Sequence, residues 1–221
     1  MSHPNQIIEQ IISDHNLFPP LINKKKVLLA LSGGLDSTVV LYFVRYLGLE
    51  PIGIQFNYQL RPKVEQTLLK KICKLTDTSL ITFQYPKVKK GDLTTFRHGL
   101  AEANSLHYLI AANFAAVNGI ELVFGGLIKN DWDDPEGQNS KHLIDRINHL
   151  VSIEFDKHPP QIIMPFIYLN KIEVVKLGRF LNVPLEQTWS CEKDMKEPCG
   201  VCGNCEIRKL SIQGQTHLNS E

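Results

Sequence analysis

The segment Lys24–Val44, KKKVLLALSGGLDSTVVLYFV, constrains the fold most, because it places a polar, glycine-containing loop between two apolar runs. Residues 27–31 form a short continuous apolar run, which is typical of a strand buried on both faces. Residues 37–47 carry apolar side chains at helical spacing, which predicts a helix directly after the loop. A buried strand, a tight turn and a buried helix in this order indicate an α/β fold.

The rest of the chain alternates between predicted strands and helices. We expect further strands at 51–56, 79–85, 120–126 and 161–166, helices at 5–15, 64–75, 101–119, 143–155 and 171–182, and loops at 86–99 and 127–140. Such alternation predicts a parallel, doubly wound sheet with helices on both faces. Ligands of such sheets bind outside the carboxyl ends of the strands. We expect one α/β domain at 1–185 and a cysteine-rich C-terminal region at 186–221.

Composition excludes some classes of protein. The formal net charge of the 221 residues is +1, so charge provides no argument for a nucleic-acid or membrane-surface partner. No apolar run approaches the roughly 18 residues that a membrane span needs. The polar start, MSHPNQIIEQ, has no signal-peptide core. We expect a cytoplasmic protein without a membrane partner.

The loop Ser32–Ser37, SGGLDS, is predicted to bind phosphate. Its glycines permit a tight turn, and free amides at the start of the following helix attract an anion. The loop is neither a Walker A motif nor Gly-x-Gly-x-x-Gly. A carboxylate beside phosphates would repel them, so Asp36 indicates an intervening cation such as Mg²⁺. The alternative is that Asp36 only caps the helix.

Four of the five cysteines lie within fifteen residues, at the spacing C-x7-C-x2-C-x2-C. Four thiolates suit tetrahedral Zn²⁺, and an iron–sulfur cluster is the alternative. A zinc site with four cysteines has no open position, which predicts a structural metal. The proposed ligands are Cys191, Cys199, Cys202 and Cys205. The fifth cysteine, Cys73, lies in an apolar predicted helix, and we expect it in the core.

The loop matches Ser-Gly-Gly-x-Asp-Ser, and so resembles the pyrophosphate-binding loop of the N-type ATP pyrophosphatases (PP-loop enzymes). This resemblance implies an enzyme that cuts ATP between its α- and β-phosphates and activates a substrate oxygen as the adenylate. It implies catalytic roles for Ser32, Asp36 and Ser37. It also implies ATP binding by Leu31, Ser32, Gly33, Gly34, Leu35, Asp36, Ser37 and Phe56.

Three stretches narrow the resemblance further: LALSGGLDSTVVL, PFIYLNKIEVVKLGRFLNVPLEQTWSC and PCGVCGNC. In this order they resemble the QueC/ExsB family of 7-cyano-7-deazaguanine synthases. The resemblance implies an adenine nucleotide alpha hydrolase-like fold with a four-cysteine zinc subdomain. It also implies a ligase that uses ATP, Mg²⁺ and ammonia to turn the carboxylate of 7-carboxy-7-deazaguanine into a nitrile, releasing AMP and pyrophosphate. Related enzymes are often homodimers.

Two stretches that correspond to substrate-binding motifs of this family are altered. The family's Pro-Gly-Arg-Asn corresponds to LAEANSLHY, which keeps Asn104. The family's substrate loop corresponds to LIKNDWDDPEGQNS, where Asp131 and Trp132 align with an Asp-Tyr pair. Trp132 could stack on a flat heterocycle, and Asp131 could accept hydrogen bonds from a guanine-like edge.

These differences leave other functions open. A divergent member could attach a deazapurine to a protein or nucleic acid, as in antiviral defence. A tRNA-thiolating enzyme of the same class would need a catalytic cysteine pair apart from the metal site, which Cys73 alone does not provide. A non-catalytic zinc module would not need the intact Ser32–Ser37 loop.

Overall fold

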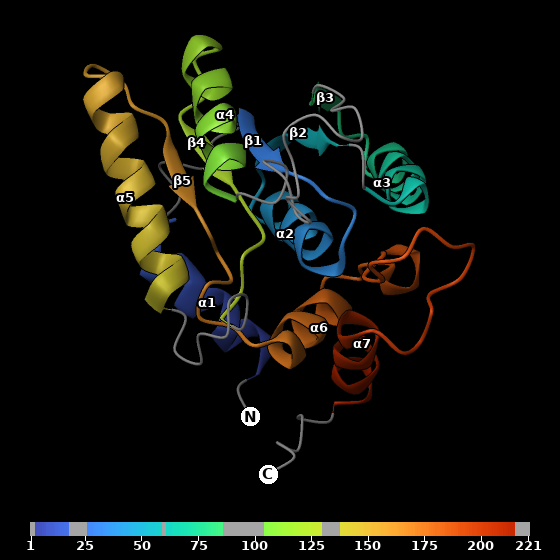
Figure 1. Ribbon diagram of the computed structural model, residues 1–221. Coiled ribbons are helices and arrows are strands. Elements are labelled where there is room, and N and C mark those ends of the chain that lie inside the picture. Colours follow the sequence, from blue (N-terminus) through green and yellow to red (C-terminus); the bar gives the residue numbers. More distant parts are fainter. Residues whose placement is uncertain (1–2, 18–25, 59–60, 86–103, 130–137, 215–221) are drawn as a thin grey trace.

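The computed structural model describes residues 3–17, 26–58, 61–85, 104–129 and 138–214 (Figure 1). Its centre is a five-stranded, wholly parallel sheet in the order β3-β2-β1-β4-β5. The strands are β1 (Lys26–Ala30), β2 (Glu50–Asn57), β3 (Leu80–Gln84), β4 (Leu122–Phe124) and β5 (Gln161–Ile163). The predicted α/β class with a parallel, doubly wound sheet is confirmed.

The central strand β1 is buried on both faces, as its apolar run predicts. It pairs with β2 on one side and with β4 on the other. Val27 and Leu29 pack into the core on one face, and Leu28 packs into the core on the opposite face. All three side chains have no measurable exposure, so this strand anchors both halves of the core.

Helices cover both faces of the sheet (Figure 1). One core contains buried side chains of α1 (Pro4–Asp14), α2 (Leu35–Tyr46), α3 (Lys63–Leu75) and α6 (Lys171–Phe180). The other core contains those of α4 (Asn104–Val117) and α5 (Gln138–Glu154). A short 3-10 helix, η3 (Leu185–Gln187), leads into the cysteine-rich segment, and α7 (Gly203–Gln213) ends the described chain. Helix α7 packs against α6.

Several boundaries differ from the predictions. Helix α2 begins at Leu35, so that Asp36 lies in its first turn rather than before it. Strands β4 and β5 end after three residues. After β4 the chain passes close to α2, where a Cβ on Gly126 would lie 2.9 Å from the amide nitrogen of Ser37. Helix α5 begins five residues before its predicted start, and α7 was not predicted.

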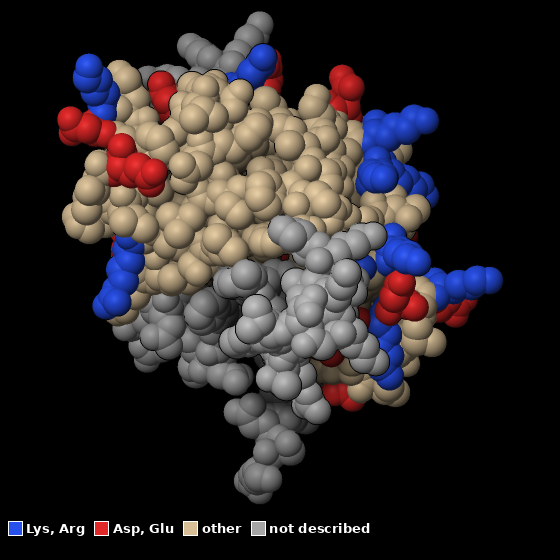
Figure 2. All heavy atoms as spheres, turned by 45° about the horizontal axis from the view of Figure 1, so that its top comes forward, with Lys and Arg blue, Asp and Glu red and all other residues tan. Residues whose placement is uncertain are grey.

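The face shown in Figure 2 has no large patch of charged side chains of one sign. Lysines, arginines and acidic residues are interspersed around the edge of a broad uncharged area. This distribution agrees with the near-neutral sequence. Within the described ranges, no helix combines the length and apolarity that crossing a bilayer would require.

Candidate active site and four-cysteine centre

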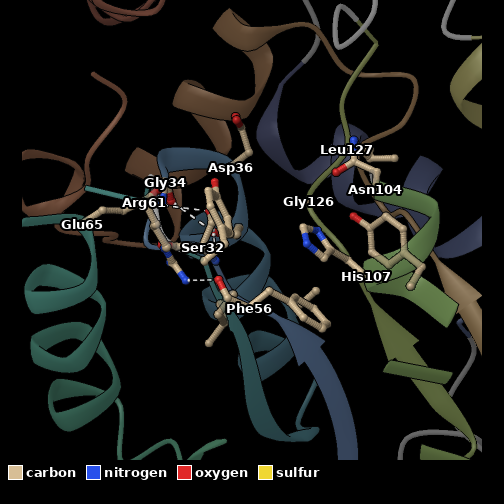
Figure 3. Close-up of a pocket in the computed structure, with 15 residues that line it drawn as sticks. Ser32, Gly34, Asp36, Phe56, Arg61, Glu65, Asn104, His107, Gly126 and Leu127 are labelled. Carbon is tan, nitrogen blue, oxygen red and sulfur yellow. Dashed lines mark hydrogen bonds and ion pairs between the residues drawn. The ribbon is translucent and has the colours of Figure 1, made fainter. Parts of the chain in front are cut away.

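A pocket of about 340 Å³ opens at the carboxyl ends of the central strands (Figure 3). The chain moves outward from β1 to β3 and then crosses to β4, so the direction of winding changes between β1 and β4. Crevices at such points are the usual ligand sites of open α/β sheets. The lining comes from the ends of β1 and β2, the start of α2, α3, the first turns of α4 and the segment after β4.

The glycine loop makes a tight turn that leaves the start of α2 open. Gly33 has φ +87°, which favours glycine. The hydroxyl of Ser32 accepts a hydrogen bond from the Gly34 amide at 3.1 Å and lies 3.0 Å from the hydroxyl of Ser37. Gly34 is the N-cap of α2, and no side chain caps this helix. The amides of its first turn therefore have no intrahelical partner and suit an anion.

Asp36 pairs with Lys171, the first residue of α6. The Lys171 Nζ lies 2.5 Å from Asp36 Oδ2, and both side chains are about four-fifths buried. Asn170 and Glu173 form a reciprocal capping box at the start of α6, which holds Lys171 in place. The other carboxylate oxygen, Asp36 Oδ1, is buried and has no hydrogen-bond partner among the described residues. An unpartnered carboxylate oxygen beside an anion site fits a hard cation.

Arg61 connects three parts of the pocket wall. Its guanidinium donates hydrogen bonds to the carbonyl oxygens of Ser32 and Phe56, and its Nε lies 2.9 Å from a Glu65 carboxylate oxygen. Arg61 is only 5% exposed, so these contacts are shielded from solvent. Burial raises the pKa of Glu65, and the guanidinium of Arg61 opposes this shift. Arg61 thereby fixes the glycine loop Ser32–Ser37 to the end of β2 and to α3.

An aromatic pair, Phe56 and His107, lines another part of the pocket wall. The rings of Phe56 and His107 stack at 4.4 Å between centroids and 14° between planes. Burial, with a smaller effect of Arg61, lowers the pKa of His107 to about 4, so its imidazole is neutral at pH 7. Its Nε2 is buried and has no hydrogen-bond partner within the described ranges. Figure 3 shows His107 and Asn104 on the same side of the pocket.

The structure brings most of the predicted nucleotide-site residues together. Those that line the pocket are Leu31, Ser32, Gly34, Asp36, Ser37 and Phe56, with Asn104 from the predicted substrate set. Gly33 is buried against α3, and the Leu35 side chain is buried in the core. Asp131 and Trp132 lie outside the described residues.

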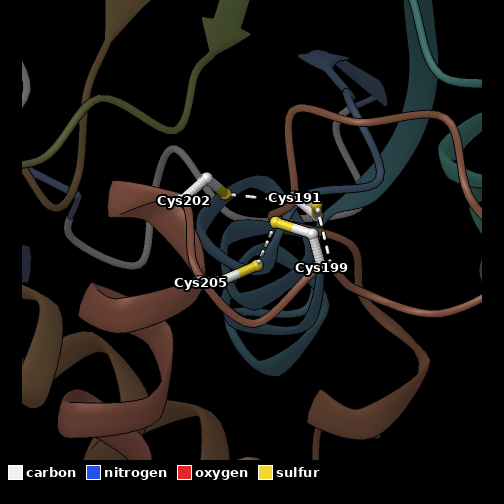
Figure 4. Close-up of side chains that lie close together, drawn as sticks. All are labelled: Cys191, Cys199, Cys202 and Cys205. Carbon is white, nitrogen blue, oxygen red and sulfur yellow. Dashed lines mark hydrogen bonds between the residues drawn. The ribbon is translucent and has the colours of Figure 1, made fainter.

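The four clustered cysteines converge on one point (Figure 4). Their sulfur atoms all lie within 4.8 Å of one another, and two of the separations are 4.0 Å. Four thiolates at 2.3 Å from one ion would be separated by about 3.8 Å in a tetrahedron. The backbone amide of Val201 and other hydrogen-bond donors lower the pKa of the Cys199 thiol to about 6. This group can hold a metal ion.

The remaining cysteine is a core residue, as predicted. Cys73 is 4% exposed, and burial raises the pKa of its thiol to about 11. A buried thiol with a raised pKa is a poor nucleophile. Because the chain has five cysteines, no second cysteine accompanies Cys73 outside the four-cysteine cluster.

Sequence reasoning missed Arg61, Lys171 and His107. Arg61 is a cation near the end of the second predicted strand, where ligands of this fold bind, and that position was an available signal. Lys171 lies inside an Asn-x-x-Glu capping pattern, which predicts the start of a helix but not that this lysine pairs with Asp36. His107 carries no local signal, because its contact with Phe56 depends on how α4 packs on the sheet.

Two protein families match the sequence of this chain. The family described as queuosine biosynthesis protein QueC matches residues 75–215, and the PP-loop domain matches residues 3–133. A 7-cyano-7-deazaguanine synthase of Sulfurimonas denitrificans is 31% identical over 208 residues, which cover 85% of this chain and 92% of the relative. The same enzyme of Thermoplasma volcanium is 30% identical, over 83% and 85% of the two chains.

Solved structures share the fold at low identity. NMN synthetase from Francisella tularensis superposes with a TM-score of 0.59 at 13% identity, covering 98% of this chain and 88% of its own. The U34-tRNA thiolase NcsA from Methanococcus maripaludis, solved with its [4Fe-4S] cluster, gives 0.58 at 14% identity, covering 95% and 77%. These likenesses establish the architecture alone.

Proposed function

The chain belongs to the QueC family of queuosine biosynthesis proteins, and from this premise we propose that it is an ATP-dependent ligase that makes 7-cyano-7-deazaguanine. Its substrates would be 7-carboxy-7-deazaguanine, ATP and ammonia. The observation that carries the proposal is the uncapped start of α2, which faces a pocket of about 340 Å³ beside an unpartnered carboxylate oxygen.

The proposed ATP site is built around the phosphate loop. First-turn amides of α2 and the hydroxyls of Ser32 and Ser37 would hold the pyrophosphate end of ATP. Lys171 would add positive charge next to Asp36. Asp36 Oδ1 suits Mg²⁺, which when bound neutralises phosphate charge and aids departure of pyrophosphate. Phosphoryl chemistry of this kind depends on positioning and electrostatic stabilisation more than on a protein nucleophile.

The proposed reaction needs two activations. A carboxylate does not react with ammonia at neutral pH until one of its oxygens becomes part of a good leaving group. The carboxylate oxygen would attack the α-phosphorus of ATP and expel pyrophosphate; ammonia would then displace AMP and lose a proton, giving the amide. The amide oxygen would attack the α-phosphorus of a second ATP and expel pyrophosphate, and loss of AMP and of both protons on the amide nitrogen would leave the nitrile.

The proposed substrate side is the wall formed by α4. Asn104 offers an amide there, and neutral His107 offers an uncharged imidazole, so neither adds charge near the carboxylate. Asp131 and Trp132 remain our candidates for recognising the deazapurine ring. We also propose that residues 186–221 form a zinc-binding region, and that the zinc is structural because four thiolates leave no open position.

The test is a product analysis. Purified protein is incubated with Mg²⁺-ATP, 7-carboxy-7-deazaguanine and ammonium, and the mixture is analysed by mass spectrometry. We expect the nitrile together with two AMP and two pyrophosphate, and the reaction without ammonium should give no nitrile. AMP without amide or nitrile would point to another acceptor, and absence of AMP under all conditions would refute the proposal.

A further inference from the structure

The segment that joins α6 to the four-cysteine centre lies against the phosphate loop. The backbone amide of Trp189 donates a hydrogen bond to the Gly33 carbonyl oxygen at 3.0 Å. The carbonyl oxygen of Trp189 is also close to the next loop residue, because it would lie 3.5 Å from a Cβ on Gly34. The backbone of Trp189 is therefore hydrogen-bonded to Gly33 and lies beside Gly34.

The same tryptophan is part of the four-cysteine centre. Its side chain is buried in a cluster with Cys191 and Cys205, and Val64 and Leu68 of α3 pack against that cluster. Its indole Nε1 donates a hydrogen bond to the Cys191 carbonyl oxygen at 2.7 Å. Trp189 is thus held by the metal-binding group on one side and holds the phosphate loop on the other.

Arg208 fixes the residues that flank Trp189. Its Nη1 lies 2.7 Å from the Thr188 hydroxyl and 3.2 Å from the Ser190 hydroxyl, and its Nη2 lies 2.5 Å from the Leu185 carbonyl oxygen. Arg208 stands three residues after Cys205 on α7. The N-cap of α7 is Cys202, so two of the four thiols set the position of this helix and hence of the guanidinium.

We propose that Trp189 and Arg208 are positioning residues that couple the four-cysteine centre to the phosphate loop. When the four thiols are drawn together, α7 places Arg208, Arg208 holds Thr188 and Ser190, and Trp189 holds Gly33–Gly34 in the conformation that accepts pyrophosphate. The proposal rests on the proposed role of this loop in ATP binding. Coupling between two sites is reciprocal in binding free energy, so nucleotide must strengthen metal binding as much as metal strengthens nucleotide binding.

The reciprocity gives a test that does not depend on turnover. Zn²⁺-loaded protein is titrated to equilibrium with a zinc chelator, with and without saturating Mg²⁺-α,β-methylene-ATP, which cannot be cleaved between its α- and β-phosphates. We expect the nucleotide analogue to raise the apparent zinc affinity roughly tenfold, a typical size for coupling between sites. Identical chelator curves, with calorimetry showing that the analogue is bound, would overturn the coupling and leave the proposed function standing. Failure of the analogue to bind zinc-loaded protein would overturn both.

Variants of Trp189 and Arg208 test whether these two residues carry the coupling. Trp189→Phe keeps an aromatic ring and removes the indole donor, and Arg208→Gln removes the three guanidinium contacts. Both should still bind one zinc per chain, bind the analogue roughly fivefold more weakly, and lose most of the coupling. The matched control is Arg179→Gln, because Arg179 donates to the Ile212 carbonyl oxygen at the far end of α7. A fall in thermal stability with unchanged analogue affinity and coupling would assign Trp189 and Arg208 a merely structural role and refute the proposal.

Discussion

Replacing Gly33 by alanine tests whether the loop conformation is imposed by its surroundings. At φ +87° an alanine costs about 1–2 kcal/mol of backbone strain. Its Cβ would also lie 2.9 Å from the Glu65 carbonyl oxygen and 3.0 Å from the Leu69 Cβ, both on α3. Forcing such an overlap in a packed interior costs about 1–3 kcal/mol more. We therefore expect Gly33→Ala to lower the free energy of unfolding by about 2–5 kcal/mol.

The matched control is Gly119→Ala. Gly119 has φ +67°, but a Cβ built there meets no atom within 4 Å. Gly119→Ala should lower the free energy of unfolding by the backbone strain alone, about 1–2 kcal/mol. Urea denaturation measures both variants, and calorimetry with an ATP analogue measures binding. If the two variants lose equal stability, the close approach of the loop to α3 is not what holds Gly33, and the reasoning is refuted.

Three other predictions concern charged or metal-binding groups. Asp36→Asn should lower ATP turnover by a factor of about 10²–10³ while the circular dichroism spectrum stays unchanged. The control is Asp145→Asn, which breaks an ion pair of the same 2.5 Å length on the exposed surface and should leave turnover unchanged. Equal turnover rates in the two variants would contradict this prediction. Cys202→Ser should bring zinc below one per chain, as measured by atomic absorption, and retention of one zinc would show that the ligand set is wrong. The pKa of His107 is lowered from 6.5 to about 4, so between these pH values the unfolded chain binds a proton that the folded chain does not. The free energy of unfolding should therefore fall as the pH drops from 6.5 to 4, by at most about 3 kcal/mol. In His107→Phe this contribution to the pH dependence of unfolding should vanish, and a slope equal to that of the original protein would rule out His107 as its source.

The sequence determined those features whose parts are close together along the chain. The glycine loop Ser32–Ser37 occupies six residues between a strand and a helix, and the four cysteines occupy fifteen. Local patterns of this kind depend on backbone turns and residue chemistry, which neighbours in sequence specify. The alternation of apolar segments likewise predicted a parallel sheet. Helix α7 was not predicted, because the closely spaced cysteines and glycines of PCGVCGNC indicate a metal-binding loop. Ile207, Leu210 and Ser211 nevertheless follow helical spacing, and Gly214 gives a helix stop.

Only the tertiary structure decided what surrounds these motifs. Asp36 is paired with a lysine 135 residues away, and the loop carbonyl of Ser32 with an arginine 29 residues away. Such partners meet because α3 and α6 pack on one face of the sheet, and that packing depends on the summed burial of many side chains. The same packing places Trp189 between the loop and the four cysteines. A sequence motif specifies which groups are available, whereas the fold specifies which of them act on one another.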